Sequence, residues 1–168
     1  FDEDFIPNFN AAPSQYLPII NNNNPTIIKQ FRWGLIPFWA KDEKIGNKLI
    51  NARSETLSEK PSFREAYKKR RCLVITDGFY EWKKTEKGKQ PYRITMKDES
   101  LFTLGGLWQE WQGLFTFSII TTQPNSLMES IHTRMPVILN KSQRKNWLSL
   151  EFNDENFKPY PPELMDAY

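Results

Sequence analysis

Apolar residues along this chain recur in short runs separated by polar turns, a pattern typical of a protein built mainly from β-strands. Pro18 marks a short edge strand at 16–20, because proline cannot donate a hydrogen bond to a central ladder. About seven strands, mostly adjacent in sequence, favour an antiparallel sheet. Besides the edge strand, the expected strands lie at residues 27–34, 72–76, 79–83, 91–96, 101–108, 114–121 and 135–139.

Helical periodicity is limited to three short segments. Residues 61–70 begin with proline and place apolar side chains at helical spacing, with Ser62 as the expected N-cap. A second helix is expected at 142–150, capped by Ser142. Residues 125–131 are expected to form a third, shorter helix.

These elements predict an α+β fold that is mainly β, with a partly closed antiparallel sheet or barrel and a few short helices. The charged stretch 84–90 is expected to be a hairpin loop, and the tail at 157–168 shows no strong pattern. The sequence has no internal repeat, low-complexity tract or interdomain linker. We therefore expect a single domain over residues 1–168.

The formal net charge is only +3, but positive charge is concentrated in two stretches. Residues 60–71 carry an excess of five positive charges, and residues 83–89 an excess of three. Such patches attract phosphates, although a solvated helix face and a lysine-tipped loop explain them more simply. Aromatic residues reach 14%, which suits either a large core or a surface on which bases stack.

The only cysteine, Cys72, excludes an internal disulfide and fits a reducing compartment. It lies in an apolar strand, where an inert core thiol is favoured over a nucleophile. No apolar run approaches the roughly 18 residues of a membrane span, and no secretory signal is present. We therefore expect no contact with a membrane.

Several familiar site signatures are missing from the sequence. It contains no phosphate-binding loop, GxGxxG, HExxH or cysteine pair, so we expect neither a metal nor another cofactor. The residues left as candidates for chemistry are His132, Glu81, Glu55, Asp77, Asn51 and the arginines.

Each candidate has a structural interpretation as well as a functional one. His132 is either a proton shuttle or a hydrogen-bonded structural residue. Glu81 faces inward as a buried carboxylate or outward into solvent, and strand alternation alone leaves both open. Asn51 and Arg53 alternate on an extended segment and would share one face, although turn capping explains them more simply. The aromatic residues Trp33, Phe38 and Trp39 favour core packing over a binding surface.

Successive blocks of the sequence resemble the SRAP family (SOS response-associated peptidase). The resemblance covers roughly residues 8–147 and keeps the family's block order. The blocks are Phe9–Pro13, Trp33–Pro37 with Trp39 and Ala40, Asn51–Thr56, Arg70–Leu73, Asp77–Lys83, Gly106–Trp108 and Ile131–Leu139.

The resemblance implies a covalent reaction with damaged DNA. SRAP proteins shield abasic sites in single-stranded DNA by closing a thiazolidine between the opened sugar and an N-terminal cysteine, which removal of the initiator Met exposes. By this resemblance, Asn51 orients the cysteine and the sugar. Glu81 positions the terminal amine and takes part in Met removal. His132 is the acid or base for ring opening and Schiff-base chemistry.

The resemblance also implies a DNA-binding surface. Arg53 and Arg134 would hold phosphates that flank the lesion, and the loop with Trp33 and Pro37 would lie against the strand. Thr121 and Met135 are assigned to the same surface. The implied partner is single-stranded DNA with abasic sites, and the implied protein is a cytoplasmic, bacterial-type monomer.

One part of the family pattern is absent, because the Met-Cys-Gly-Arg start does not precede Phe1. We therefore expect the nucleophilic Cys to lie upstream of Phe1, and the chain as given to lack crosslinking activity. The alternative from another class is a noncatalytic module that binds single-stranded nucleic acid. A conventional peptidase acting on other proteins has no independent support, since no Ser-His-Asp or Cys-His order is present.

Overall fold

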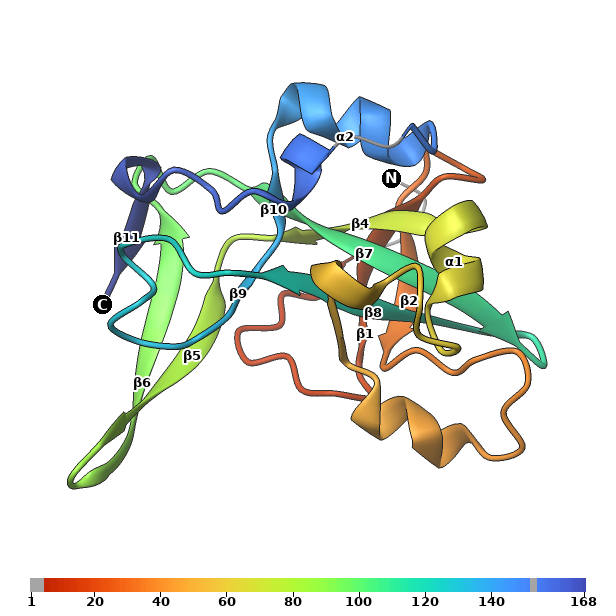
Figure 1. Cartoon of the computed structure of the whole chain (residues 1–168), viewed down its shortest axis with the longest axis horizontal. Helices are drawn as coiled ribbons and strands as arrows, with labels where there is room; N and C mark the ends of the chain where they lie inside the picture. Colours follow the sequence, from red (N-terminus) through yellow and green to blue (C-terminus); the bar gives the residue numbers. More distant parts are fainter. Residues whose placement is uncertain (1–4, 152–153) are drawn as a thin grey trace.

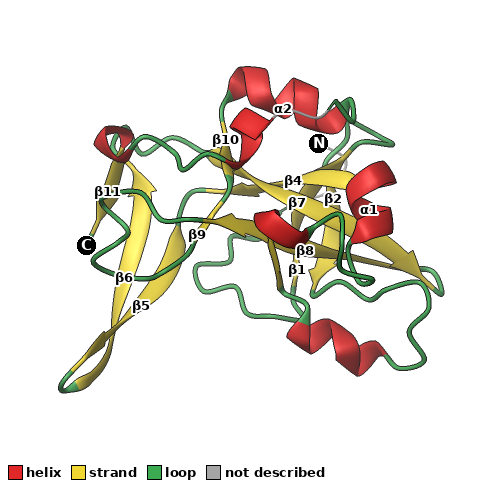
Figure 2. Cartoon of the chain, viewed as in Figure 1, coloured by secondary structure: helices red, strands yellow, loops and turns green. Residues whose placement is uncertain are grey.

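Five strands pair side by side into a closed barrel in the computed structural model, which describes residues 5–151 and 154–168 (Figures 1 and 2). Their order is β7-β4-β1-β2-β8, and β8 pairs back with β7. The expectation of a mainly β, α+β fold with a barrel is confirmed, although the β2–β8 pair is parallel. The barrel strands are β1 (Tyr16–Asn21), β2 (Lys29–Trp33), β4 (Arg71–Thr76), β7 (Phe102–Trp111) and β8 (Leu114–Thr122).

A second, three-stranded antiparallel sheet stands beside the barrel. Its order is β11-β6-β5, from β5 (Phe79–Thr85), β6 (Gly88–Met96) and β11 (Met165–Ala167). The hairpin predicted at 84–90 is confirmed, but its loop is shorter than expected, because β5 and β6 stay paired until a two-residue turn closes the hairpin. The strand β11 was not expected, since three residues on a sheet edge are too few to show a period.

The helices are few and short, as expected. Two predicted caps are wrong: no side chain caps α1, and Asn140 rather than Ser142 caps α2, in a capping box with Gln143. The helix predicted at 125–131 is wrong, because residues 126–131 form turns. Within the described ranges, no helix is long and apolar enough to cross a membrane. The helical elements are α1 (Arg64–Lys69), α2 (Lys141–Leu148), and the 3-10 turns η1 (Glu43–Lys48), η2 (Ser54–Thr56), η3 (Asp154–Phe157) and η4 (Pro162–Leu164).

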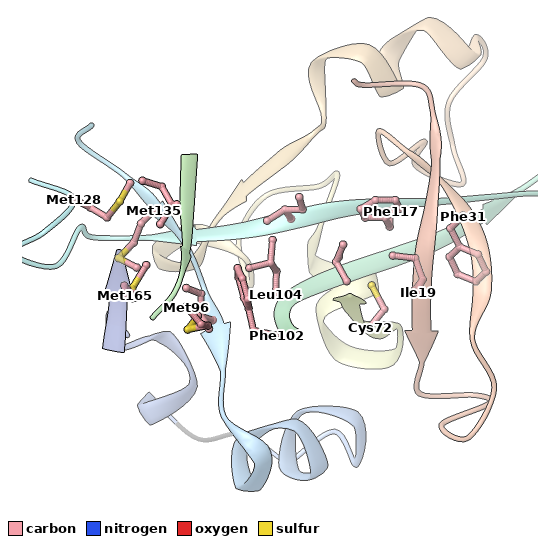
Figure 3. Close-up of a cluster of buried hydrophobic side chains, with 14 of the residues drawn as sticks. Ile19, Phe31, Cys72, Met96, Phe102, Leu104, Phe117, Met128, Met135 and Met165 are labelled. Carbon is pink, nitrogen blue, oxygen red and sulfur yellow. The ribbon is translucent and has the colours of Figure 1, made fainter. Parts of the chain in front are cut away.

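One hydrophobic core runs from the barrel into the second sheet. Figure 3 shows Ile19, Phe31 and Phe117 at the barrel end of this cluster, and the methionines gathered at its other end. All four methionines of the chain belong to the cluster. Because methionine is flexible, it fills the irregular space where two sheets of different direction meet. The shared core makes the two sheets one domain.

A short segment is inserted between β7 and β8 at the point where those strands separate. β9 (Met135–Pro136) pairs with the end of β8, and β10 (Ile138–Leu139) pairs with β7. Between them, Val137 donates its N–H to the Ile120 carbonyl and accepts from the Gly105 N–H, both at 2.8 Å. The single strand predicted here is therefore divided between two partners. The backbone groups of the diverging strands are satisfied, and the residues before β9 are held at the end of β8.

The loop after β2 packs its backbone against η1 at a point where only glycine fits. Gly34 has a φ of 120°, and a Cβ there would lie 2.5 Å from the carbonyl oxygen of Gly46. A Cβ on Gly46 would lie 2.8 Å from the Gly34 oxygen. This close approach holds η1 and the following β3 (Asn51–Arg53) against the barrel, where β3 pairs parallel with β8.

Gly34→Ala is expected to lower the free energy of unfolding by about 3 kcal/mol, because a left-handed φ and a backbone clash combine. Gly88→Ala is the matched control: its φ is 119°, but an added Cβ meets nothing within 4 Å. The control should lose only about 1 kcal/mol. Urea denaturation measures both variants, and equal losses would contradict the importance of the Gly34–Gly46 contact.

Candidate functional site

The end of β8 brings three of the predicted site residues together. Thr121 lies opposite Arg53 of β3 on one edge and opposite Pro136 of β9 on the other. Arg134 reaches back to the same residue, and its Nη2 donates to the Thr121 carbonyl oxygen at 2.8 Å. The Nε and Nη2 atoms also lie 3.4 and 3.3 Å from the Thr121 hydroxyl. The end of β8 therefore positions both Arg53 and Arg134.

A carboxylate holds the Arg134 guanidinium. Its Nη1 and Nη2 donate to Oε1 and Oε2 of Glu55 at 2.7 and 2.8 Å, a two-pronged charge-assisted pair. Glu55 lies in η2, directly after β3. The Arg134 side chain is 14% exposed and that of Glu55 is 44% exposed. The hydrogen bonds from Arg134 hold the pKa of Glu55 below its ordinary value.

His132 and Glu81 face each other across the site. The Nε2 atom of His132 lies 3.8 Å from Oε2 of Glu81, too long for a hydrogen bond but close enough for electrostatic coupling. The Nδ1 atom lies 3.2 Å from both the backbone nitrogen and the backbone oxygen of Arg134. When Nδ1 accepts from that N–H, the neutral ring carries its proton on Nε2, the atom that faces Glu81.

Strand alternation decides the orientation of Glu81, which the sequence left open. Tyr80 and Trp82 are exposed, whereas Glu81 is half-buried on the opposite face of β5. Burial raises the pKa of the Glu81 carboxyl, and the nearby His132 opposes that effect. A carboxyl with a raised pKa beside an imidazole is suited to exchanging protons with a substrate.

Asn51 and Arg53 extend from β3 on either side of the buried Ala52 and share one exposed face, as the alternation predicted. Neither side chain has a hydrogen-bond or ion-pair partner among residues 5–151 and 154–168. Both are therefore available to a ligand. The two arginines predicted to bind phosphate differ in this respect, because Arg134 is already engaged by Glu55.

The other residues predicted to contact DNA are less exposed. Pro37, Thr121 and Met135 are buried. Trp33 is half-buried, and its Nε1 donates to the carbonyl oxygen of Ile50 at 3.0 Å. Thr121 instead holds the Arg134 guanidinium through its carbonyl oxygen and its hydroxyl. Direct contact of DNA with these four side chains stays a prediction.

Exposed aromatic residues lie next to residues that were predicted to belong to the site. Phe38 and Trp39 follow Pro37 in the loop and are exposed, so the expectation that they pack in the core is wrong. Tyr80 and Trp82, on either side of Glu81, were not predicted as site residues. The signal was present in the sequence, because an inward Glu81 forces its two strand neighbours outward.

Cys72 is buried in β4 without exposed surface, as expected for an inert core thiol. Burial also raises the pKa of this thiol, which keeps it protonated. The described part of the chain contains no cluster of three His, Cys, Asp or Glu residues that could hold a metal ion.

Known proteins resemble this chain in both sequence and fold. The family model described as SOS response associated peptidase (SRAP) matches residues 1–168. The chain is 49% identical to the abasic site processing protein YoqW of Bacillus subtilis (strain 168), over 98% of this chain and 79% of that protein. It is 29% identical to HMCES of Xenopus tropicalis, over 86% of this chain and 54% of that protein. A crystal structure from Bacteroides thetaiotaomicron matches with a TM-score of 0.83 and 38% identity, over 92% of this chain and 73% of that one.

Glu55→Gln is expected to remove the ion pair with Arg134 and to lower the stability at pH 7 by about 1 kcal/mol or less, since Glu55 is partly solvated. The pKa of Glu55 is lower in the folded than in the unfolded chain. The contribution of this ion pair to the stability is therefore complete above the ordinary pKa of 4.5. It is lost as the pH falls through the lowered pKa that Glu55 has in the folded chain.

Urea unfolding at several pH values measures this effect. The difference between the parent protein and Glu55→Gln should shrink as the solution is acidified below that window. Glu110→Gln, at an exposed position on β7, is the matched control and should show no such difference. A gap between parent and Glu55→Gln that persists in acid would contradict the assignment.

Proposed function

Since this chain belongs to the SOS response associated peptidase (SRAP) family, we propose that it binds abasic sites in single-stranded DNA and captures them as a covalent adduct. The substrate is supported by the name of the relatives, abasic site processing proteins. The observation that carries the proposal is the His132–Glu81 pair, at 3.8 Å, close in the chain to an arginine held at the end of β8. An acid–base pair beside cations suits a reaction on a DNA sugar.

The proposed reaction traps the aldehyde form of the abasic sugar. The sugar is mostly a closed hemiacetal, so a base must take the hydroxyl proton while an acid protonates the ring oxygen. The free aldehyde condenses with the amine of an N-terminal cysteine and loses water to form an imine. The thiol sulfur then adds to the imine carbon, its proton passes to nitrogen, and a thiazolidine closes intramolecularly.

The side chains of the site fit these steps. His132 exchanges the protons of ring opening, and Glu81 holds the N-terminal amine and serves the removal of the initiator Met. Asn51 offers an unpaired amide to the sugar or the cysteine. Arg53 offers its guanidinium to a phosphate next to the lesion. Arg134 fixes the segment that carries His132.

The nucleophile of this proposal is a cysteine upstream of Phe1, because the buried Cys72 cannot reach a DNA sugar. A noncatalytic binding module would explain the cations but gives no reason to bury Glu81 against His132. That juxtaposition favours the reaction over binding alone.

A chain that begins at Phe1 is expected to give no shifted band with abasic single-stranded DNA on a denaturing gel. A longer chain that starts with cysteine should give one, and Cys72→Ala in that longer chain should leave the band intact. A band from the chain that begins at Phe1, or loss of the band on Cys72→Ala with the fold retained, would contradict the assignment.

His132→Ala and Glu81→Gln, in the longer chain, are expected to slow adduct formation by about 100-fold with little change in DNA affinity, because the first removes the acid–base group and the second the carboxylate that holds the amine. In the longer chain without these substitutions the rate should rise with pH through the raised pKa of Glu81, and Glu81→Gln should remove this rise.

Glu129→Gln is the matched control, because Glu129 is exposed and lies three residues before His132. Single-turnover adduct formation at several pH values gives the rate, and fluorescence anisotropy gives the affinity. Parent-like rates in both His132→Ala and Glu81→Gln would remove the basis for a catalytic pair.

A further inference from the structure

The β5–β6 ribbon has a second face that the proposed reaction does not use. Directly opposed residues of an antiparallel pair share a face, and successive residues alternate between faces. Glu81 and its partner Tyr92 lie on one face, so their strand neighbours lie on the other. We call this second face the outer face of the ribbon; it consists of Tyr80, Trp82, Lys84, Lys89, Pro91 and Arg93.

Aromatic rings are exposed on the outer face. Tyr80 is 46% exposed, Trp82 is 52% exposed, and Tyr168 is 66% exposed. Tyr168 extends this face by a third strand, because its backbone exchanges hydrogen bonds with that of Arg93 at 2.7 and 3.1 Å. Single exposed apolar residues are common on proteins, but several rings on one sheet face indicate a binding surface.

Positive charge continues from these rings to the tip of the ribbon. The turn and its flanks carry Lys83, Lys84, Lys87 and Lys89 against the single acidic residue Glu86. The ribbon extends away from the barrel in Figure 1, and a shallow hollow of about 580 Å³ lies along residues 85–91. A solvated lysine loop would explain the cations but not the exposed rings beside them.

We propose that the outer face binds a second segment of the same single DNA strand, beyond the nucleotides next to the lesion; this rests on the proposed function. Bases stack on Trp82 and Tyr80, and phosphates contact Lys84 and Lys89. The partner is single-stranded because a duplex hides the faces of its bases within the stack. The strand can reach this face because β5 is the edge strand of its sheet, with Glu81 and Trp82 on its two sides.

The test compares the affinity for lesion-free oligonucleotides of about 5 and about 20 nucleotides, lengths chosen from the site sizes of single-strand binders. The parent chain should bind the longer strand more tightly. Trp82→Ala should reduce this gain about tenfold, the usual loss when one stacking ring is removed. The double variant Lys84→Glu/Lys89→Glu should reduce the gain and flatten the salt dependence.

The matched control is Lys141→Glu/Lys145→Glu, which makes the same charge change on exposed positions of α2, and it should keep the gain. Equal losses in the ribbon and control variants would overturn the proposal, because charge alone would then account for binding. Equally tight binding of a blunt duplex with the same dependence on Trp82 would overturn it too, since the rings would then not stack on bases.

A third variant separates this proposal from the proposed function. His132→Ala should keep the gain with strand length, although it slows adduct formation in the longer chain. If adduct formation fails in every protein while Trp82→Ala still loses the gain, the proposed function fails and the outer face stands. If the parent shows no gain with length but the longer chain forms the adduct, the outer face is wrong and the proposed function stands.

Discussion

The backbone hydrogen bonds of two diverging strands control where the site can form. Where β7 leaves β8, each strand would present unpaired N–H and C=O groups to the core, a cost that folded chains avoid. Val137 and its neighbours fill that gap and bond to both strands. Because the inserted segment cannot slide without losing bonds on both sides, the residues just before it are fixed at the end of β8. His132 and Arg134 owe their positions to this constraint.

The electrostatics of the site follow from the same placement. Arg134 donates to Glu55 and to Thr121 with both of its Nη atoms in use, so its charge is neutralised within the protein. A guanidinium held in this way stiffens the backbone that carries the imidazole, and a phosphate would have to compete with Glu55 for it. Arg53 has no such partner among the described residues. The two arginines that sequence alone treats alike therefore differ in the structure: Arg134 is held by Glu55 and Thr121, whereas the Arg53 guanidinium donates to no described residue.

Local patterns in the sequence predicted the strands and the barrel, but not the contacts that complete them. Apolar runs predict β4 and β8, which are buried along most of their length, whereas β11 has only three residues on an edge and shows no pattern. The charged ribbon tip has the composition of a loop, because its hydrogen bonds are between strands and leave no apolar period in the sequence. The pairing of His132 with Glu81, which are far apart in the chain, depends on how two sheets meet. No local pattern in the sequence encodes how the two sheets meet. The family resemblance identifies both residues but does not give the distance between them.

A single edge strand carries both halves of the proposed function. Alternation along β5 turns Glu81 toward His132 and turns Tyr80 and Trp82 toward solvent, so a shift of one residue in register would exchange them. Such a shift would place the rings of Tyr80 and Trp82 against the imidazole and would place the Glu81 carboxylate among the lysines. The acid–base pair and the cationic face would then both be lost. The register is held by Phe79 and Ile94, which lie opposite each other and face the common core. The apolar base of the ribbon therefore specifies the chemistry on one face and the surface on the other.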